Sequence, residues 1–184
     1  MKFAHIPNNK KYSVLVIDPP WQYQDKGKSG KRGASQHYKT LSFLQLLKLP
    51  INKISKRNSL LFLWFTDTHM IEASLLSMAW GFQPVRIGFV WIKVTKDFEK
   101  QRIMLGRYTR SNAEFVLIGK KGGGIKRKNN AIRQVIFSIP GKHSQKPNDV
   151  NERIDKLYPR IKKIEMFARN KTKKSNWDYW GDQV

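Results

Sequence analysis

The feature that most constrains the fold is a short apolar run, Tyr12–Ile17, which ends abruptly in Asp18-Pro19-Pro20-Trp21. The run is rich in β-branched residues, follows a basic segment and is stopped by two prolines, which is typical of a buried parallel strand. In open α/β sheets ligands bind at the carboxyl ends of the strands, because the chain leaves the sheet there and opens a crevice. We therefore expect Asp18 to lie at a ligand-binding edge of a sheet.

The same four residues suit one kind of chemistry, the activation of an exocyclic aromatic amine such as that of adenine. The lone pair of this amine is delocalised into the ring and must be localised before it can attack a methyl donor. The Asp18 carboxylate and the Pro19 carbonyl can each accept one amine hydrogen, and the fixed φ angles of Pro19 and Pro20 hold both acceptors in place. Trp21 offers a flat face for stacking on a base, worth roughly 1 to 3 kcal/mol. The structural alternative is a turn with a solvated Asp18 and a packing Trp21.

Other motifs follow in a fixed order along the chain: Tyr38–Ser42, Leu61–Thr66, Gly106–Tyr108 with Glu114, Ser144–Pro147, Ile164–Arg169 and Trp177–Asp182. With the Asp-Pro-Pro-Trp segment, this series resembles the adenine-N(6) methyltransferases typified by the catalytic subunit of the eukaryotic messenger-RNA methyltransferase. That family has many short prokaryotic and phage relatives. The resemblance covers almost the whole chain, and so many motifs in one order are highly specific.

The resemblance implies a Rossmann-like class I S-adenosylmethionine-dependent methyltransferase with circularly permuted motifs, catalytic strand first and cofactor strand last. The alternation of predicted strands and helices independently indicates an α/β sandwich, a mostly parallel sheet with helices on both faces. Further strands are predicted over 59–65, 85–94, 113–119, 134–139 and 161–167. The sequence contains no GxGxxG fingerprint, which disfavours a dinucleotide cofactor.

Three helices are predicted between these strands. The first begins at Thr40 or Ser42 and ends at Pro50, with leucines expected in the core: Leu44, Leu47 and Leu49. The second begins at Asp67 or Thr68 and runs to Trp80, with an apolar stripe expected to pack inward: Met70, Ile71, Leu75 and Met78. The third begins at Pro147-Asn148-Asp149.

The charge of the chain points to a polyanionic partner. With 184 residues the chain is expected to form one domain, 1–184, and its 36 Lys and Arg against 13 Asp and Glu give a net charge of +23. Nucleic acid is the simplest partner for such an excess. An anionic membrane would call for a basic amphipathic helix, whereas the cationic residues here concentrate in predicted loops at 22–36, 95–111 and 120–130.

Composition also bounds the setting. The chain has no cysteine and its histidines show no ligand spacing, so we expect no metal. No signal-peptide pattern is present, and we expect a cytoplasmic protein, nucleoid-associated or phage-encoded, that is a monomer or a homodimer.

Lys146 is the main candidate for holding a cofactor. It stands at a predicted helix entrance, where backbone N–H groups and the helix dipole favour an anion. By resemblance that anion is the methionine carboxylate of S-adenosylmethionine, whose product is S-adenosylhomocysteine; an ordinary surface lysine is the alternative. The resemblance adds the remaining predicted cofactor residues, with Asp182 standing where the family more often has Asn: Asp18, Phe167, Arg169, Asp182 and Gln183.

The predicted substrate contacts include the loop over 22–36, which combines glycines with cations directly after the catalytic turn. We expect it to close over an extruded base while its cations hold phosphates; a disordered connector is the alternative. The aromatic candidates are Trp21, Tyr23, Tyr38 and Trp64. The charged candidates are Lys26, Lys28, Lys31, Arg32, Arg110 and Glu114. For Glu114 the resemblance implies a place near the base, and the local alternative is a charge at a strand entrance.

These observations predict methyl transfer from S-adenosylmethionine to the N(6) amine of adenine in DNA, by direct displacement and with loose sequence specificity. RNA is the alternative substrate, since nothing in the sequence recognises or excludes a 2′-hydroxyl. A catalytically silent nucleic-acid-binding partner of another methyltransferase is the alternative of a different class. It would be expected to have lost the catalytic tetrad or Lys146, and both are intact.

Overall fold

One mostly parallel sheet grows outward from the predicted N-terminal strand in the computed structural model, which describes residues 6, 9–22, 40–103, 106, 108–141, 145–169, 171 and 175–181. β1 (Tyr12–Ile17) pairs in parallel with β2 (Ser55–Phe65) on one side and with β6 (Lys163–Met166) on the other. Within these described ranges the sheet has seven strands in the order β5-β3-β4-β2-β1-β6-β7. β1 is therefore central, and it is buried as the sequence predicts.

The strand that breaks the parallel order is β4 (Ala113–Lys121), which runs antiparallel to both β2 and β3 (Gln83–Lys93). β5 (Val135–Ser138) then pairs in parallel with β3. Because β4 is reversed, it begins at the edge where the other strands end. The predicted strands are thus found, with shifted ends.

One strand was missed. β7 (Trp177–Trp180) pairs in parallel with β6 and forms the sheet's edge, whereas the prediction took 161–167 as the last strand. β7 has only four residues, which is too short for an alternation of apolar and polar side chains to be recognised in the sequence. Its place is fixed instead by distant contacts, such as the hydrogen bond from the Tyr12 hydroxyl to Asp178 at 2.7 Å.

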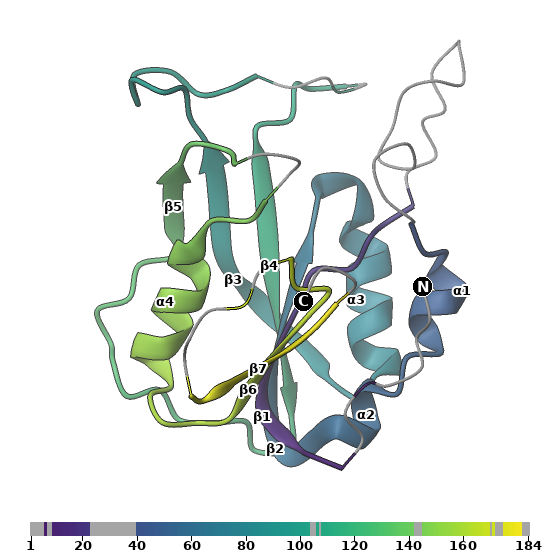
Figure 1. Cartoon of the computed structure of the whole chain (residues 1–184). Helices are drawn as coiled ribbons and strands as arrows, with labels where there is room; N and C mark the ends of the chain where they lie inside the picture. Colours follow the sequence, from purple (N-terminus) through teal and green to yellow (C-terminus); the bar gives the residue numbers. More distant parts are fainter. Residues whose placement is uncertain are drawn as a thin grey trace.

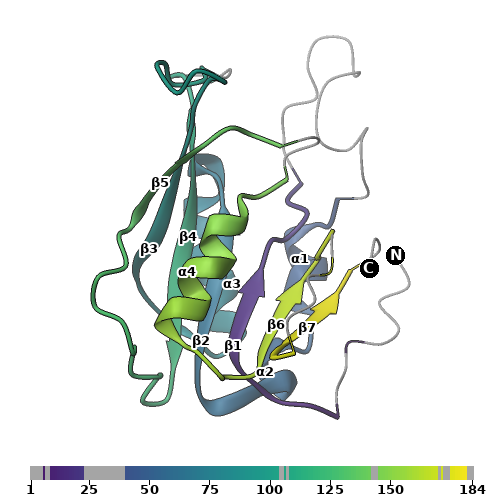
Figure 2. The ribbon, with the colours of Figure 1, turned by 60° about the vertical axis from the view of Figure 1, so that its left-hand side comes forward.

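Helices cover both faces of the sheet, which gives the predicted three-layer α/β sandwich (Figure 1). α1 (Phe43–Leu47), α2 (Ile51–Ile54) and α3 (Met70–Ala79) lie on one face, and α4 (Asn148–Leu157) lies on the other, as the turned view in Figure 2 also shows. Alternate residues of β1 serve the two cores, because neighbouring strand residues point to opposite faces. Leu15 packs with the core under α1 to α3, and Val16 packs with the core under α4.

The predicted packing of the first helix is partly wrong. Ser42 caps α1 as expected, accepting a hydrogen bond from the Gln45 amide while the Gln45 side chain accepts one from the Ser42 amide. However, Leu44 is exposed, and the fully buried leucine of this helix is Leu46. Leu47 is half-buried and Leu49 is buried.

The predicted stripe of α3 is wrong as a whole. Its four large apolar residues are exposed: Met70, Ile71, Leu75 and Met78. The helix buries Ala73, Leu76 and Ser77 instead, and the two small residues Ala73 and Ser77 let it lie close to the sheet. A Cβ added to Gly119 of β4 would lie 2.7 Å from the Ser77 hydroxyl. A 3-10 turn (Asp67–His69) precedes α3, and within the described part of the chain no helix is long and apolar enough to cross a membrane.

Candidate active site

Five side chains from separate segments meet at the carboxyl edge of the sheet. Asp18 directly follows β1, Trp64 is next to last in β2, and Lys93 is the last residue of β3. Glu114 is the second residue of the reversed strand β4, and Lys146 lies just before α4. This is the edge at which the strand pattern predicted a ligand site.

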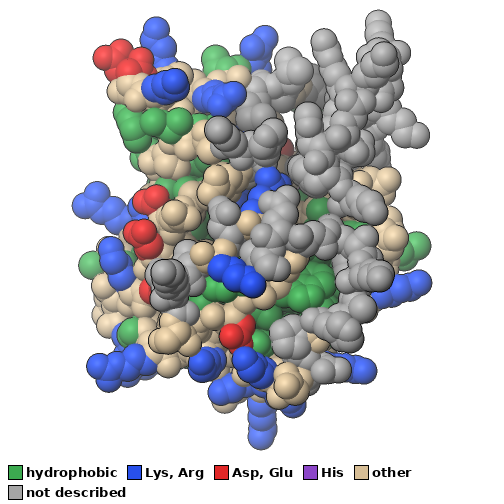
Figure 3. All heavy atoms as spheres, viewed as in Figure 1, with side chains coloured by type: hydrophobic (Ala, Val, Ile, Leu, Met, Phe, Trp, Pro, Cys, Tyr) green, Lys and Arg blue, Asp and Glu red, His purple; other side chains and the backbone are tan. Residues whose placement is uncertain are grey.

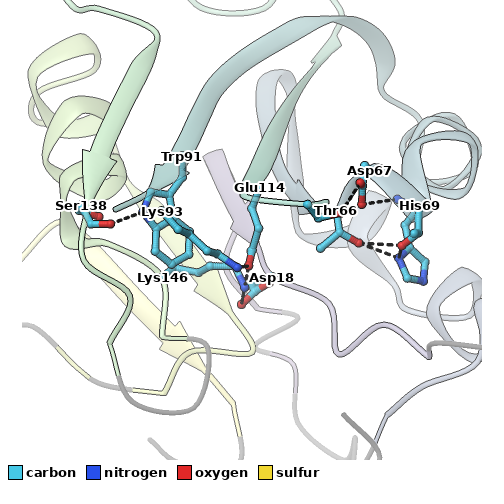
Figure 4. A network of polar contacts seen from close by, with 11 residues as sticks. Asp18, Thr66, Asp67, His69, Trp91, Lys93, Glu114, Ser138 and Lys146 are labelled. Carbon is cyan, nitrogen blue, oxygen red and sulfur yellow. Dashed lines mark hydrogen bonds and ion pairs between the residues drawn. The ribbon is translucent and has the colours of Figure 1, made fainter. Parts of the chain in front are cut away.

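The charged side chains at this edge form one connected cluster, which we call the edge cluster: Asp18, Lys93, Glu114 and Lys146. The Lys146 ammonium lies 2.9 Å from Asp18 Oδ2 and 3.2 Å from Glu114 Oε2, and the Lys93 ammonium lies 2.6 Å from Glu114 Oε1. Figure 4 shows both lysines pointing toward the two acids. Their charges sum to zero, which compensates for removing them from water. The Trp64 ring forms the floor, with its centroid 5.5 Å from the Lys146 ammonium.

Burial and charge act in opposite directions on these groups. Burial raises the pKa of Asp18, and although Lys146 lowers it, Glu114 adds to the rise and the pKa stays above its usual value. For Glu114 burial also raises the pKa, but Lys146 and Lys93 together hold it below the usual range. Burial lowers the pKa of Lys146, yet the two carboxylates outweigh this and raise it. Of the two acids of the cluster, Asp18 has its pKa raised and Glu114 has its pKa lowered, so Asp18 holds its proton more readily.

The acidic corner is rigid. Pro19 and Pro20 are both buried. The Pro19 carbonyl accepts a hydrogen bond from the Trp21 amide at 2.8 Å, and the Pro20 carbonyl accepts one from the Leu41 amide at 2.9 Å. A carbonyl oxygen has two lone pairs, so Pro19 keeps the capacity to accept one further hydrogen.

Trp21 packs within the fold, which matches the structural alternative of a packing tryptophan, and its stacking on a base stays a prediction. Its side chain is only 6% exposed, and its indole N–H donates to the Trp64 carbonyl at 3.0 Å. One ring face is stacked on His69, with centroids 5.0 Å apart. His69 is brought against the Trp21 ring by tertiary structure, and the local sequence carries no signal of this contact.

His69 is itself a residue that sequence reasoning missed. Its Nδ1 lies 3.1 Å from the Thr66 hydroxyl, and its Nε2 lies 3.3 Å from the Gln22 carbonyl oxygen. Through these contacts His69 links the end of β2 to the segment that leaves the catalytic corner. The sequence indicated only that His69 follows shortly after the strand β2, which ends at the carboxyl edge of the sheet.

The predicted cofactor residues after β6 lie where that strand meets β7. Phe167 has a positive φ of 60° and its ring packs edge-on against Trp180, with centroids 5.1 Å apart. A Cβ on Gly181 would lie 2.4 Å from the Ala168 carbonyl oxygen, so only glycine permits this approach. Arg169 lies near enough to Asp18 for its charge to lower the pKa of that acid, after the larger influences of burial, Lys146 and Glu114.

The structure also gives the positions of three other predicted site residues. Trp64 is buried beneath Lys146, Glu114 turns its carboxylate toward two lysines, and Arg110 is exposed. The segment that carries Arg110 is tethered to the start of α3 through Ser111, whose hydroxyl donates to Asp67 at 2.7 Å. Several predicted contacts lie outside the described residues: Tyr23, Lys26, Lys28, Lys31, Arg32, Tyr38, Asp182 and Gln183.

Basic side chains are more frequent than acidic ones on the described part of one face of the molecule. In Figure 3, Lys and Arg side chains are spread around the rim of the face shown, whereas Asp and Glu are few. Such a distribution matches the excess of positive charge in the sequence and suits the phosphate groups of a nucleic acid.

The fold and the edge cluster together define the class as a Rossmann-like α/β methyltransferase, with the catalytic strand first and the cofactor strands last. Residues 12–183 match MT-A70, and the chain belongs to the MT-A70 family. The chain is thus an adenine-N(6) methyltransferase, as its motifs predict.

Individual relatives support this assignment. The chain is 37% identical to the type II methyltransferase M.MunI of a Mycoplasma species over 99% of its own length and 81% of that protein. It is 30% identical to the N6-methyladenosine RNA methyltransferase MTA1 of Cryphonectria parasitica, covering 94% of this chain and 52% of MTA1. The human N(6)-adenine-specific methyltransferase METTL4 is also 30% identical, over 95% of this chain and 38% of METTL4. The chain thus spans about half or less of these two larger relatives.

Proposed function

We propose that the protein transfers a methyl group from S-adenosylmethionine to the exocyclic N(6) amine of adenine in DNA, with loose sequence specificity. The observation that carries the proposal is the 2.9 Å contact between Asp18 and Lys146. It joins the acid that would activate the amine to the cation that the motifs assign to the methyl donor. An enzyme that brings donor and acceptor together needs these two groups in one site.

The residues around the edge cluster fit the donor chemically. Lys146, at the entrance of α4, supplies a cation for the methionine carboxylate, and Asp18 supplies an acid near the methionine ammonium. We propose that the ribose is held by Arg169, Asp182 and Gln183. Phe167 is proposed to contact the donor beside the point where Gly181 lies close to the Ala168 backbone. When bound, S-adenosylmethionine supplies an electrophilic methyl group.

Asp18 and Pro19 act on the amine. The Asp18 carboxylate accepts one N–H and the Pro19 carbonyl accepts the other, which localises the lone pair and stabilises the positive charge that develops on the nitrogen. Because the two prolines fix this corner, little reorganisation is needed during the reaction. Lys146 favours the ionised form of Asp18, which is the form that accepts a hydrogen bond.

The target adenine must leave the base stack to reach this corner. Extrusion from a duplex costs a few kcal/mol, so we expect single-stranded or distorted sites to be preferred unless the basic loops offset this cost. Tyr23 and Tyr38 are proposed to stack on the base. DNA is preferred over RNA because the type II methyltransferase M.MunI matches the chain over most of both lengths.

A labelled-methyl assay tests this proposal by comparing single-stranded DNA, duplex DNA and RNA of the same sequence. We expect the highest activity on DNA. The isosteric Asp18→Asn should lower kcat by about 10² to 10⁴-fold, because the amide cannot accept with a full negative charge. Glu152→Gln, which removes an exposed acid from α4, is the matched control.

Two results would overturn parts of the proposal separately. Near-normal turnover by Asp18→Asn would refute the proposed activation of the amine. Higher activity on RNA than on either DNA would replace the substrate but leave the chemistry intact.

A further inference from the structure

Lys93 is a buried charge for which the motifs give no role. Its side chain is 9% exposed, and burying an ammonium group is costly unless it is paired. Its partner is Glu114, at 2.6 Å, and its ammonium lies 5.0 Å from the centroid of the Trp91 ring. Trp91 is fully buried and donates its indole N–H to the Ser138 carbonyl at 3.3 Å. Lys93 is therefore held on a fixed platform.

Glu114 divides its two oxygens between two lysines. Oε1 faces Lys93 and Oε2 faces Lys146 at 3.2 Å, while Lys146 also contacts Asp18 at 2.9 Å. The order Lys93–Glu114–Lys146–Asp18 thus alternates in charge from the Trp91 platform to the catalytic corner (Figure 4). Glu114, the acid before the corner, is thus paired with Lys93 on the side away from the corner.

Removing the charge of Lys93 would leave two carboxylates competing for Lys146. Coulombic attraction is strong at these separations in a poorly hydrated site. Glu114, with Lys146 as its remaining cation in the edge cluster, would draw that ammonium away from Asp18. The donor carboxylate would then have to compete with an incompletely neutralised acid.

We propose that Lys93 is a positioning residue, which neutralises the far oxygen of Glu114 and so leaves Lys146 placed to serve both Asp18 and the carboxylate of the methyl donor. The proposal rests on the proposed function for the identity of the donor. In this role Lys93 acts through Glu114, which it contacts at 2.6 Å, and not by binding the donor itself.

Calorimetric titration with S-adenosylhomocysteine tests the proposal without turnover. Lys93→Met should weaken binding about tenfold or more. The decisive variant is Lys93→Met combined with Glu114→Gln, because it removes the uncompensated acid along with its cation. We expect the double variant to recover affinity to within about threefold of the unaltered protein.

A purely structural role for Lys93 predicts the opposite result. The double variant would then bind as weakly as Lys93→Met or more weakly, which would overturn the proposal, as would unchanged affinity in Lys93→Met. Lys163→Met is the matched control, since it removes another buried lysine that contacts a tryptophan ring but lies away from the edge cluster. Its folded form should bind normally.

The pH dependence of kcat/KM gives a second readout that packing alone would not move. Burial raises the pKa of Glu114, and Lys93 is one of the two cations that oppose this rise. Without Lys93 the pKa of Glu114 should therefore be higher, and the acidic limb of the profile should move to higher pH. If Lys93→Met does not fold, Lys93→Gln keeps a hydrogen-bond donor without the charge and should show the same shift. An unmoved limb in the folded variant contradicts the proposal.

The two proposals fail in different ways. If the unaltered protein binds no S-adenosylhomocysteine and no S-adenosylmethionine, the proposed function fails. If it binds and Lys93→Met binds equally well, the role of Lys93 alone is refuted.

Discussion

The amino and carboxyl edges of the sheet each hold a lysine that is paired with acid, and they use it differently. At the amino edge Lys163 opens β6, is fully buried, and pairs with Asp155 of α4 at 3.1 Å. It also donates to the Ile161 carbonyl at 3.1 Å and lies 5.6 Å from the Trp177 ring centroid. Trp177 in turn donates its indole N–H to Asp155. The chain itself supplies the partners of this charge.

At the carboxyl edge Lys146 is 20% exposed and is shared between two acids. Both sites combine a lysine, an acid and a tryptophan, so residue types alone do not separate them. The two sites differ in how far the lysine is enclosed. Lys163 is enclosed by α4 and the strand ends, whereas Lys146 lies where the chain leaves the sheet. A paired lysine thus supports the fold where it is enclosed, and it can bind a ligand where it is open and shared.

The largest expected effect separates the two lysines by stability. Lys163→Met leaves Asp155 without its buried cation and should lower the free energy of unfolding by about 3–5 kcal/mol, measured by denaturant titration. Combining it with Asp155→Leu should recover most of that loss. Lys146→Met should instead abolish donor binding with a smaller loss of stability. Equal destabilisation by the two single variants would contradict the different roles given to Lys163 and Lys146.

An intermediate effect concerns Glu165 of β6, which is hydrogen-bonded to Asn151 at 2.8 Å. Burial raises the pKa of Glu165 to about 7, the Asn151 bond opposes the rise and Asp18 adds to it. Because the pKa of Glu165 is higher in the folded protein than in the unfolded chain, its protonated form stabilises the fold. This contribution is fully present below the pKa of the unfolded chain and is lost as the pH rises through about 7.

Glu165→Gln should therefore stabilise the protein more at pH 8 than at pH 5, by about 1–3 kcal/mol. Thermal unfolding at the two pH values measures this difference. The same gain at both pH values would show that the carboxyl is not the titrating group.

The smallest effect is expected at the exposed pair of Lys10 and Asp178. Lys10 is 60% exposed and lies 3.2 Å from Asp178, so Lys10→Ala should change stability by less than about 1 kcal/mol. Tyr12→Phe removes the 2.7 Å hydrogen bond to the same carboxylate from a buried side chain and should cost about 1–2 kcal/mol. A larger loss from Lys10→Ala than from Tyr12→Phe would contradict the importance given to burial.

The central strand, the acidic corner and the lysine before α4 were predictable because each is encoded in a few consecutive residues. Their meeting at one edge follows from the rule for parallel strands. Lys93 was missed because a lysine at the end of a predicted strand resembles an ordinary solvent-exposed charge. The packing of Trp21 was not predictable, since its partner His69 is distant in sequence. The apolar stripe of α3 was misassigned because the helix packs through Ala73, Leu76 and Ser77 instead.

The reversal of β4 has a consequence for how such an enzyme can be altered. Because β3 ends and β4 begins at the ligand edge, the connection between them emerges directly above the edge cluster. The paired strands anchor both of its ends. Residues can thus be inserted or exchanged in this connection while the register of the sheet and the groups of the edge cluster stay fixed.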